Sequence, residues 1–193
     1  MSQISTHVTL LRALAEDENA DAWDEFVQRY GSLIQGVARR QGLPAQDCDD
    51  VVQDVLMALT GNMKRFEYDP SKGKFRAYLK TISLRAVFAR FRQKHRDQAQ
   101  GDVEDATSPL AQALETSWEE EWRQYHLRRA MAHIEPEFSD LDVAAFRAYA
   151  VEQRDAKRVS DALGISLDRV YQAKSRFLKR LRERVTEQIE EEG

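Results

Sequence analysis

Apolar residues recur at intervals of three and four along most of the chain, which predicts helices almost throughout. Gly and Pro are few, and no run of alternating apolar and polar residues indicates a hairpin. The first long segment runs from Ala22 to about Arg40 and ends at Gly42-Leu43-Pro44. Its inner stripe consists of Trp23, Phe26, Val27, Tyr30, Leu33, Ile34 and Val37. The pattern predicts an all-α fold.

A second helix is expected to begin at Asp47, because an Asp side chain can accept hydrogen bonds from first-turn amides, and to end near Gly61. The turn-forming run Tyr68–Gly73 predicts an exposed loop over Arg65–Lys74. A third helix should run from Phe75 to about His95, with Phe75 and Ile82 in the core. We expect an N-terminal domain over 1–96, an acidic flexible linker over 97–126 in which helical periodicity resumes from Ser117, and a C-terminal domain over 127–193.

Charge is strongly segregated, although the whole chain carries a net charge of only −4. Residues 64–96 hold eleven Lys or Arg against two acids, and six aromatic residues lie among them. Residues 97–125 hold eight acids against one Arg, and residues 154–184 hold ten basic residues against four acids. Cations attract phosphate, and aromatic rings stack on unpaired bases. The first basic segment therefore fits a partly opened nucleic acid or, equally, a solvated helix whose aromatics face a core.

The run Val151–Val185 has the pattern of a helix-turn-helix. Asp155–Leu163 is a short predicted helix with Val159 and Leu163 facing inward. Gly164 supplies the positive φ of the turn, Ile165 fills the angle between the helices and Ser166 caps the second helix. That helix is expected to bury Leu167, Val170, Tyr171, Phe177 and Leu181 and to present a basic face to the DNA major groove.

Asp50, Gln53 and Asp54 are spaced so that they share one face of the second helix. This face fits a protein partner with a basic surface. Five features follow one another along the chain: Asp49–Leu56, the Pro/Gly loop, Phe75–Ile82, the acidic linker and the helix-turn-helix. In this order they resemble the extracytoplasmic-function (ECF) sigma factors of bacterial RNA polymerase, in the sigma-70 family. The resemblance covers about residues 20–96 and 127–185.

The resemblance implies a role for each segment. The first domain would bind core polymerase and melt the −10 element, and the second would bind the −35 element as duplex. The partners implied are promoter DNA and core RNA polymerase, through its β′ clamp helices and β flap; no anti-sigma factor or other regulator can be named. Residues expected at these interfaces are Asp50, Gln53 and Asp54 for core polymerase, Arg65, Lys72, Lys74, Arg76, Tyr78, Lys80, Arg85 and Arg92 for the −10 element, and Ser166, Arg169, Gln172, Lys174, Ser175, Arg176 and Lys179 for the −35 element.

The chain departs from the family pattern in the third helix and at the start of the last one. Tyr78 stands where the family usually has Trp, and Arg85 and Ala89 stand where it usually has Asn and Asp. Arg169 replaces the common Thr. The promoter sequence therefore cannot be carried over from the family.

Other functions are less well matched by the residues. No catalytic constellation, metal site or cofactor motif is present in the sequence, so no enzyme activity is expected. Cys48 is the single cysteine, and no secretion signal or membrane-spanning run is found, which favours a cytoplasmic protein without membrane insertion. The alternative is a stand-alone helix-turn-helix regulator whose N-terminal domain senses a ligand or dimerises. A module that binds acidic protein partners is a third possibility.

Overall fold

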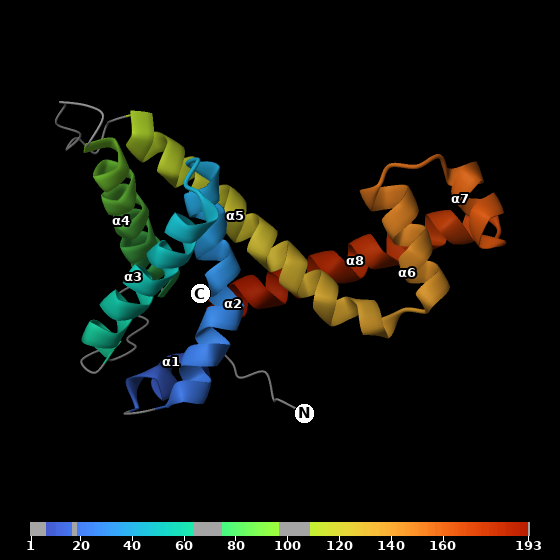
Figure 1. The fold of residues 1–193 in the computed structure, drawn as a ribbon. Coiled ribbons are helices and arrows are strands. Elements are labelled where there is room, and N and C mark those ends of the chain that lie inside the picture. Colours follow the sequence, from blue (N-terminus) through green and yellow to red (C-terminus); the bar gives the residue numbers. More distant parts are fainter. Residues whose placement is uncertain (1–6, 17–18, 64–74, 97–108, 193) are drawn as a thin grey trace. The chain divides into compact units, whose positions relative to one another are not determined.

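The computed structural model describes residues 7–16, 19–63, 75–96 and 109–192. These residues form helices and no strand, which confirms the all-α prediction for the described part of the chain (Figure 1). The α-helices are α1 (His7–Ala15), α2 (Ala20–Arg40), α3 (Ala45–Met63), α4 (Phe75–Arg96), α5 (Pro109–Ile134), α6 (Asp140–Phe146), α7 (Ala156–Leu163) and α8 (Leu167–Glu192). Two short helical segments, η2 (Glu135–Glu137) and η3 (Arg147–Val151), flank α6.

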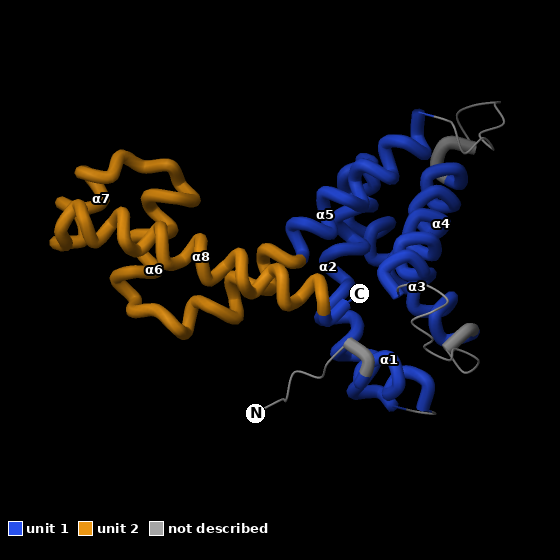
Figure 2. Tube along the Cα trace, turned by 180° about the vertical axis from the view of Figure 1, so that it is seen from behind, with its two compact units in different colours: residues 1–125, 191–193 blue, residues 126–190 orange. Residues whose placement is uncertain are grey.

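The chain divides into two compact units (Figure 2). Unit 1 comprises residues 1–125 and 191–193, and unit 2 comprises residues 126–190. Helix α5 contributes its first two thirds to unit 1 and its last turns to unit 2. Within the described helices, none is both long enough and apolar enough to cross a lipid bilayer.

The core of unit 1 is built around α2, as its apolar stripe predicted, except that Val27 is 38% exposed and lies outside the core. Phe26 and Tyr30 are fully buried, and the ring of Phe75 from α4 meets Phe26 edge-on with centroids 6.3 Å apart. The prediction that Phe75 and Ile82 are core residues is confirmed. Helix α1, which the sequence did not single out, adds three buried leucines to this core: Leu10, Leu11 and Leu14.

Helix α3 begins earlier than predicted. It starts at Ala45, and the amide of Cys48 donates to the carbonyl of Pro44, so Asp47 lies in the first turn and is not the N-cap. Proline is well tolerated at a helix start because its missing N–H belongs to the amides that have no partner within the helix. The carboxylate of Asp47 accepts instead from Nε of Arg90 on α4, at 3.2 Å.

The second half of the predicted flexible linker is a helix. Residues 97–108 lie outside the described residues, but α5 starts at Pro109 and continues beyond the predicted end of the linker at 126. The reason is an apolar stripe at helical spacing within the acidic composition: Leu114, Trp118, Trp122 and Tyr125 are all buried in the unit 1 core. The acids of this segment occupy the remaining sides of a packed helix.

Unit 2 packs the helix-turn-helix against α6 and the end of α5. The ring of Phe177 on α8 stacks between Phe138 and Phe146, with centroids 3.8 and 4.5 Å away. Val159 of α7 and Val170 of α8 are buried together, as predicted. Leu167 and Tyr171 are not buried as expected: they are 40% and 46% exposed, and the core positions of this part of α8 are occupied by Val170 and Ala173.

The turn between α7 and α8 has the predicted chemistry. Gly164 has φ 63°, and Oγ of Ser166 accepts from the amide of Arg169 at 3.2 Å. Asp155, predicted as the first residue of the preceding helix, is the N-cap of α7 and accepts from the amide of Arg158. Ile165 is partly buried against the cluster that holds Val159. The α7–α8 segment is therefore a capped helix-turn-helix.

Replacing Gly164 with Ala is expected to destabilise unit 2 by about 1 kcal/mol, because a Cβ atom at positive φ is strained although no neighbour lies within 4 Å of it. The matched change Gly61→Ala, in the open last turns of α3, should instead stabilise unit 1 by about 0.5 kcal/mol through helix propensity. Urea unfolding measures both. Shifts of the same sign for the two variants would contradict the assignment of strain to Gly164.

Candidate nucleic-acid interfaces

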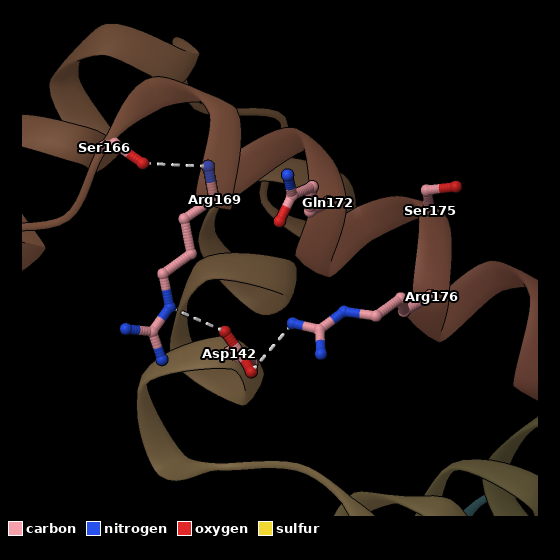
Figure 3. A pocket seen from close by; sticks show the side chains of 6 residues that line it. All are labelled: Asp142, Ser166, Arg169, Gln172, Ser175 and Arg176. Carbon is pink, nitrogen blue, oxygen red and sulfur yellow. Dashed lines mark hydrogen bonds and ion pairs between the residues drawn. The ribbon is translucent and has the colours of Figure 1, made fainter.

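An open pocket on unit 2 gathers five of the seven residues predicted for the −35 element. Ser166 comes from the turn and the others from the exposed side of α8 (Figure 3). The sixth lining residue is an acid that the sequence gave no reason to include, Asp142 of α6. The residues that line the pocket are Asp142, Ser166, Arg169, Gln172, Ser175 and Arg176.

Asp142 joins two arginines of α8. Its Oδ1 accepts from Nε of Arg169 and its Oδ2 accepts from Nη2 of Arg176, each at 3.0 Å (Figure 3). The Asp142 side chain is only 8% exposed, whereas Arg169 and Arg176 are 40% and 56% exposed. Burial alone would raise the pKa of Asp142, but hydrogen bonds from Arg169 and Ser139 and the charge of both arginines outweigh it and hold the pKa below its ordinary value.

Lys174 is not part of this pocket. Its Nζ lies 4.9 Å from the ring centroid of Tyr149, which in turn meets Tyr171 edge-on. Because α8 turns by about 100° per residue, Lys174 lies almost opposite Arg176, and a single duplex on the pocket would not contact both. Lys179 is exposed one turn beyond Ser175, on the same side as the pocket. The structure thus separates Lys174 from the other predicted residues.

Helix α4 divides its predicted −10 residues between two sides. Tyr78, Arg85 and Arg92 follow one another at intervals of seven and form one stripe, along which Arg85 and Arg92 are exposed and Tyr78 is half-buried against the core. Arg76 and Lys80 lie on another side of the helix. Arg65, Lys72 and Lys74 lie outside the described residues, so the predicted base-binding loop is not placed.

Arg76 and Lys80 face the acidic side of α5. Glu119 accepts from Nη2 of Arg76 at 2.5 Å and from Nζ of Lys80 at 3.2 Å, and Glu115 also pairs with Lys80. The guanidinium of Arg76 lies 5.0 Å from the ring centroid of Trp122. Burial would raise the pKa of Glu119, but the hydrogen bond from Lys80 and the charges of Arg76 and Lys80 lower it overall. Both cations are therefore held within unit 1.

The predicted polymerase-binding residues share one side of α3. Gln53 is exposed, Asp54 is half-buried, and Met57, one turn further along, is 65% exposed. Asp50 belongs to the same side, but its carboxylate pairs with the guanidinium of Arg90 from α4. The residues of this side whose side chains reach solvent most fully are thus Gln53 and Met57. Met57 was not singled out from the sequence, although its spacing of four from Gln53 places it on this surface.

Among the described residues, no group of three or more His, Cys, Asp or Glu side chains could hold a metal ion. The two units instead present basic and acidic helix surfaces, and unit 2 contains a capped helix-turn-helix. This combination defines the class of helix-turn-helix proteins with a separate helical domain.

Comparison with known proteins finds similarity to one family over part of the chain. The family model for Sigma-70 region 2 matches residues 26–97, which comprise most of α2, all of α3 and α4 and the segment between them. The RNA polymerase sigma factor NccH of Alcaligenes xylosoxydans xylosoxydans is 34% identical over 109 residues, which cover 55% of this chain and 56% of NccH. The RNA polymerase sigma factor CnrH of Cupriavidus metallidurans is 36% identical over 89 residues, which cover 44% of this chain and 45% of CnrH.

The chain therefore spans about half the length of the curated relatives it matches. A solved structure of CnrH in complex with the cytosolic domain of CnrY aligns with 95% of this chain and 97% of that one, at 23% identity and a TM-score of 0.36. The region 2 match over residues 26–97 and the two sigma-factor relatives support the resemblance to the sigma-70 family over about half of the chain.

Proposed function

We propose that this protein is a sigma factor, which binds core RNA polymerase, directs it to promoters and helps to open the DNA for initiation. The observation that carries the proposal is the match of α2–α4 to Sigma-70 region 2, because this region has no place in a stand-alone helix-turn-helix regulator. No catalytic step by the chain itself is required.

The proposal assigns one partner to each surface. Gln53, Asp54 and Met57 of α3 bind the clamp helices of the β′ subunit. The stripe of Tyr78, Arg85 and Arg92 on α4 lies along the melted −10 strand, where each stacked base contributes about 1–3 kcal/mol. The pocket of unit 2 binds the −35 element as duplex, and the β flap holds unit 2 on the enzyme.

Two weak interfaces become specific when the polymerase holds them at a fixed separation. The net charge of −4 repels free DNA, so the isolated chain should bind promoters poorly. Bound to the enzyme, the two units act at a high effective concentration on neighbouring promoter elements, and their affinities combine.

Run-off transcription tests this function. The full chain is added to bacterial core polymerase over a library of promoter templates, and transcripts are sequenced. We expect a family of templates that is transcribed only when the chain is present. A chain that neither binds core polymerase nor yields any transcript would overturn the proposal, whereas duplex binding by a dimer without polymerase would favour the stand-alone regulator.

A further inference from the structure

A buried acid lies in the pocket of unit 2, between two arginines of α8. Asp142 carries a negative charge into a pocket that otherwise presents two arginines and neutral polar side chains. A pocket that attracted phosphate by charge alone would bind more strongly without this acid. Its side chain is 8% exposed and is fixed by the first turn of α6, whose N-cap Ser139 accepts from the amide of Asp142 at 3.3 Å.

Asp142 determines how the two arginines are presented. Arg169 and Arg176 are seven residues apart on α8, so their Cα atoms are separated by about 10.5 Å along the helix axis. Their guanidinium groups nevertheless converge on the two oxygens of one carboxylate (Figure 3). Arg169 also donates to Oγ of Ser139 at 3.3 Å. Without Asp142, both long side chains would be free to spread over the exposed surface.

Most hydrogen-bond donors of the two arginines remain available to a ligand. A guanidinium has five N–H groups; Asp142 accepts from one nitrogen of each arginine, and Ser139 accepts from a second nitrogen of Arg169. An arginine that is already oriented loses less side-chain entropy when it binds, and a bidentate contact to O6 and N7 of guanine requires a specific orientation of the fork.

We infer that Asp142 is a positioning residue: it orients Arg169 and Arg176 so that they contact base edges of a duplex, and it increases sequence discrimination at the expense of total affinity. This inference rests on the proposed function of the unit 2 pocket. Asp142 itself repels phosphate, so its presence weakens binding to every duplex, while the fixed arginines favour the duplex whose bases match them.

The test compares Asp142→Asn with the wild-type chain, each assembled with core polymerase. Duplexes with a randomised upstream element are first selected with the wild-type complex. The affinities for the selected duplex and for a scrambled one are then measured at two salt concentrations. We expect Asp142→Asn to reduce the ratio of the two affinities about tenfold, in line with the loss of one oriented bidentate contact. Binding to the scrambled duplex should stay the same or become tighter.

Glu137→Gln is the matched control. Glu137 accepts two hydrogen bonds, of 2.7 and 2.9 Å, from Arg180. Arg180 lies on α8, as Arg169 and Arg176 do, but outside the pocket. This variant loses the same charge and removes one of the carboxylates that pair with Arg180, which keeps Glu183 and Glu187 as partners, and the discrimination ratio should not change. Thermal unfolding of both variants shows whether unit 2 remains folded.

A second comparison separates positioning from a general structural role. In the Arg169→Gln, Arg176→Gln background, Asp142→Asn should cause no further loss of discrimination. An equal loss with and without the arginines would overturn the inference, as would a variant that binds both duplexes more tightly with an unchanged ratio. If the wild-type complex itself fails to discriminate between duplexes, the proposed function of the pocket is wrong and the inference falls with it.

Discussion

Replacing Gln53 and Asp54 together with arginine is expected to reduce the affinity for core polymerase by on the order of 100-fold or more. Both side chains lie on the outer side of α3, beside the exposed Met57. The double change turns an acidic helix surface into a basic one, and a basic partner surface would then meet like charge at the centre of the contact, where single residues commonly contribute 2 kcal/mol or more. Fluorescence anisotropy of the labelled chain, titrated with core polymerase, measures the loss.

The control for this experiment is Asp24→Arg with Gln28→Arg. Both residues are exposed on α2, so this control makes the same change of charge at a different helix surface. This variant should bind core polymerase as the wild type does. If Gln53→Arg, Asp54→Arg retains affinity within about threefold of the control, the polymerase-binding surface is not on this side of α3.

Asp50 is left out of the experiment because of its partner within the fold. Arg90 of α4 lies between Asp47 and Asp50 and pairs with both carboxylates. Arginine at position 50 would confront Arg90 and weaken the contact between α3 and α4. A loss of binding by that variant would therefore report on unit 1 stability as much as on the interface.

The sequence predicted best those features that local chemistry determines. The helix-turn-helix was predicted almost to the residue, because the Asp155 cap, the positive φ of Gly164 and the Ser166 cap all act over a few positions. The long helices α2 and α4 followed from apolar periodicity. The N-cap of α3 was misplaced by three residues because Asp47 resembles a cap, whereas the carbonyl of Pro44 accepts the first bond of a helix that starts at Ala45.

The partners of the charged residues could not be predicted in the same way. Glu119 meets Arg76 across 43 residues, and Asp142 meets Arg169 across 27, so neither pair has a local signal. The acidic composition of residues 97–126 suggested a flexible chain and obscured the stripe of Leu114, Trp118 and Trp122 that makes α5 a packed helix. Two cations predicted for the −10 element, Arg76 and Lys80, are therefore paired with acids of α5 that the sequence did not indicate.

These internal pairs lead to a second prediction with a large effect: Glu115→Gln with Glu119→Gln should strengthen binding of the free chain to a single-stranded oligonucleotide. In the wild type these two acids of α5 hold Arg76 and Lys80, two of the cations predicted for the melted strand. Releasing both makes two further phosphate contacts possible. The slope of log affinity against log salt should therefore steepen by about 1.4, and the affinity at about 50 mM salt should rise on the order of tenfold or more.

The charge-matched control is Glu120→Gln with Glu135→Gln. It removes the same two charges and also breaks two ion pairs, to Arg40 and Arg147, which lie outside the predicted strand-binding residues. All four acids are at least one quarter exposed, and ion pairs of this kind contribute about 0–1 kcal/mol, so both variants should stay folded. Equal gains in the two variants would mean that net charge alone limits binding by the free chain. A gain confined to Glu115→Gln, Glu119→Gln would mean that α5 competes with the melted strand for α4, and that the strand must displace these glutamates when the promoter opens.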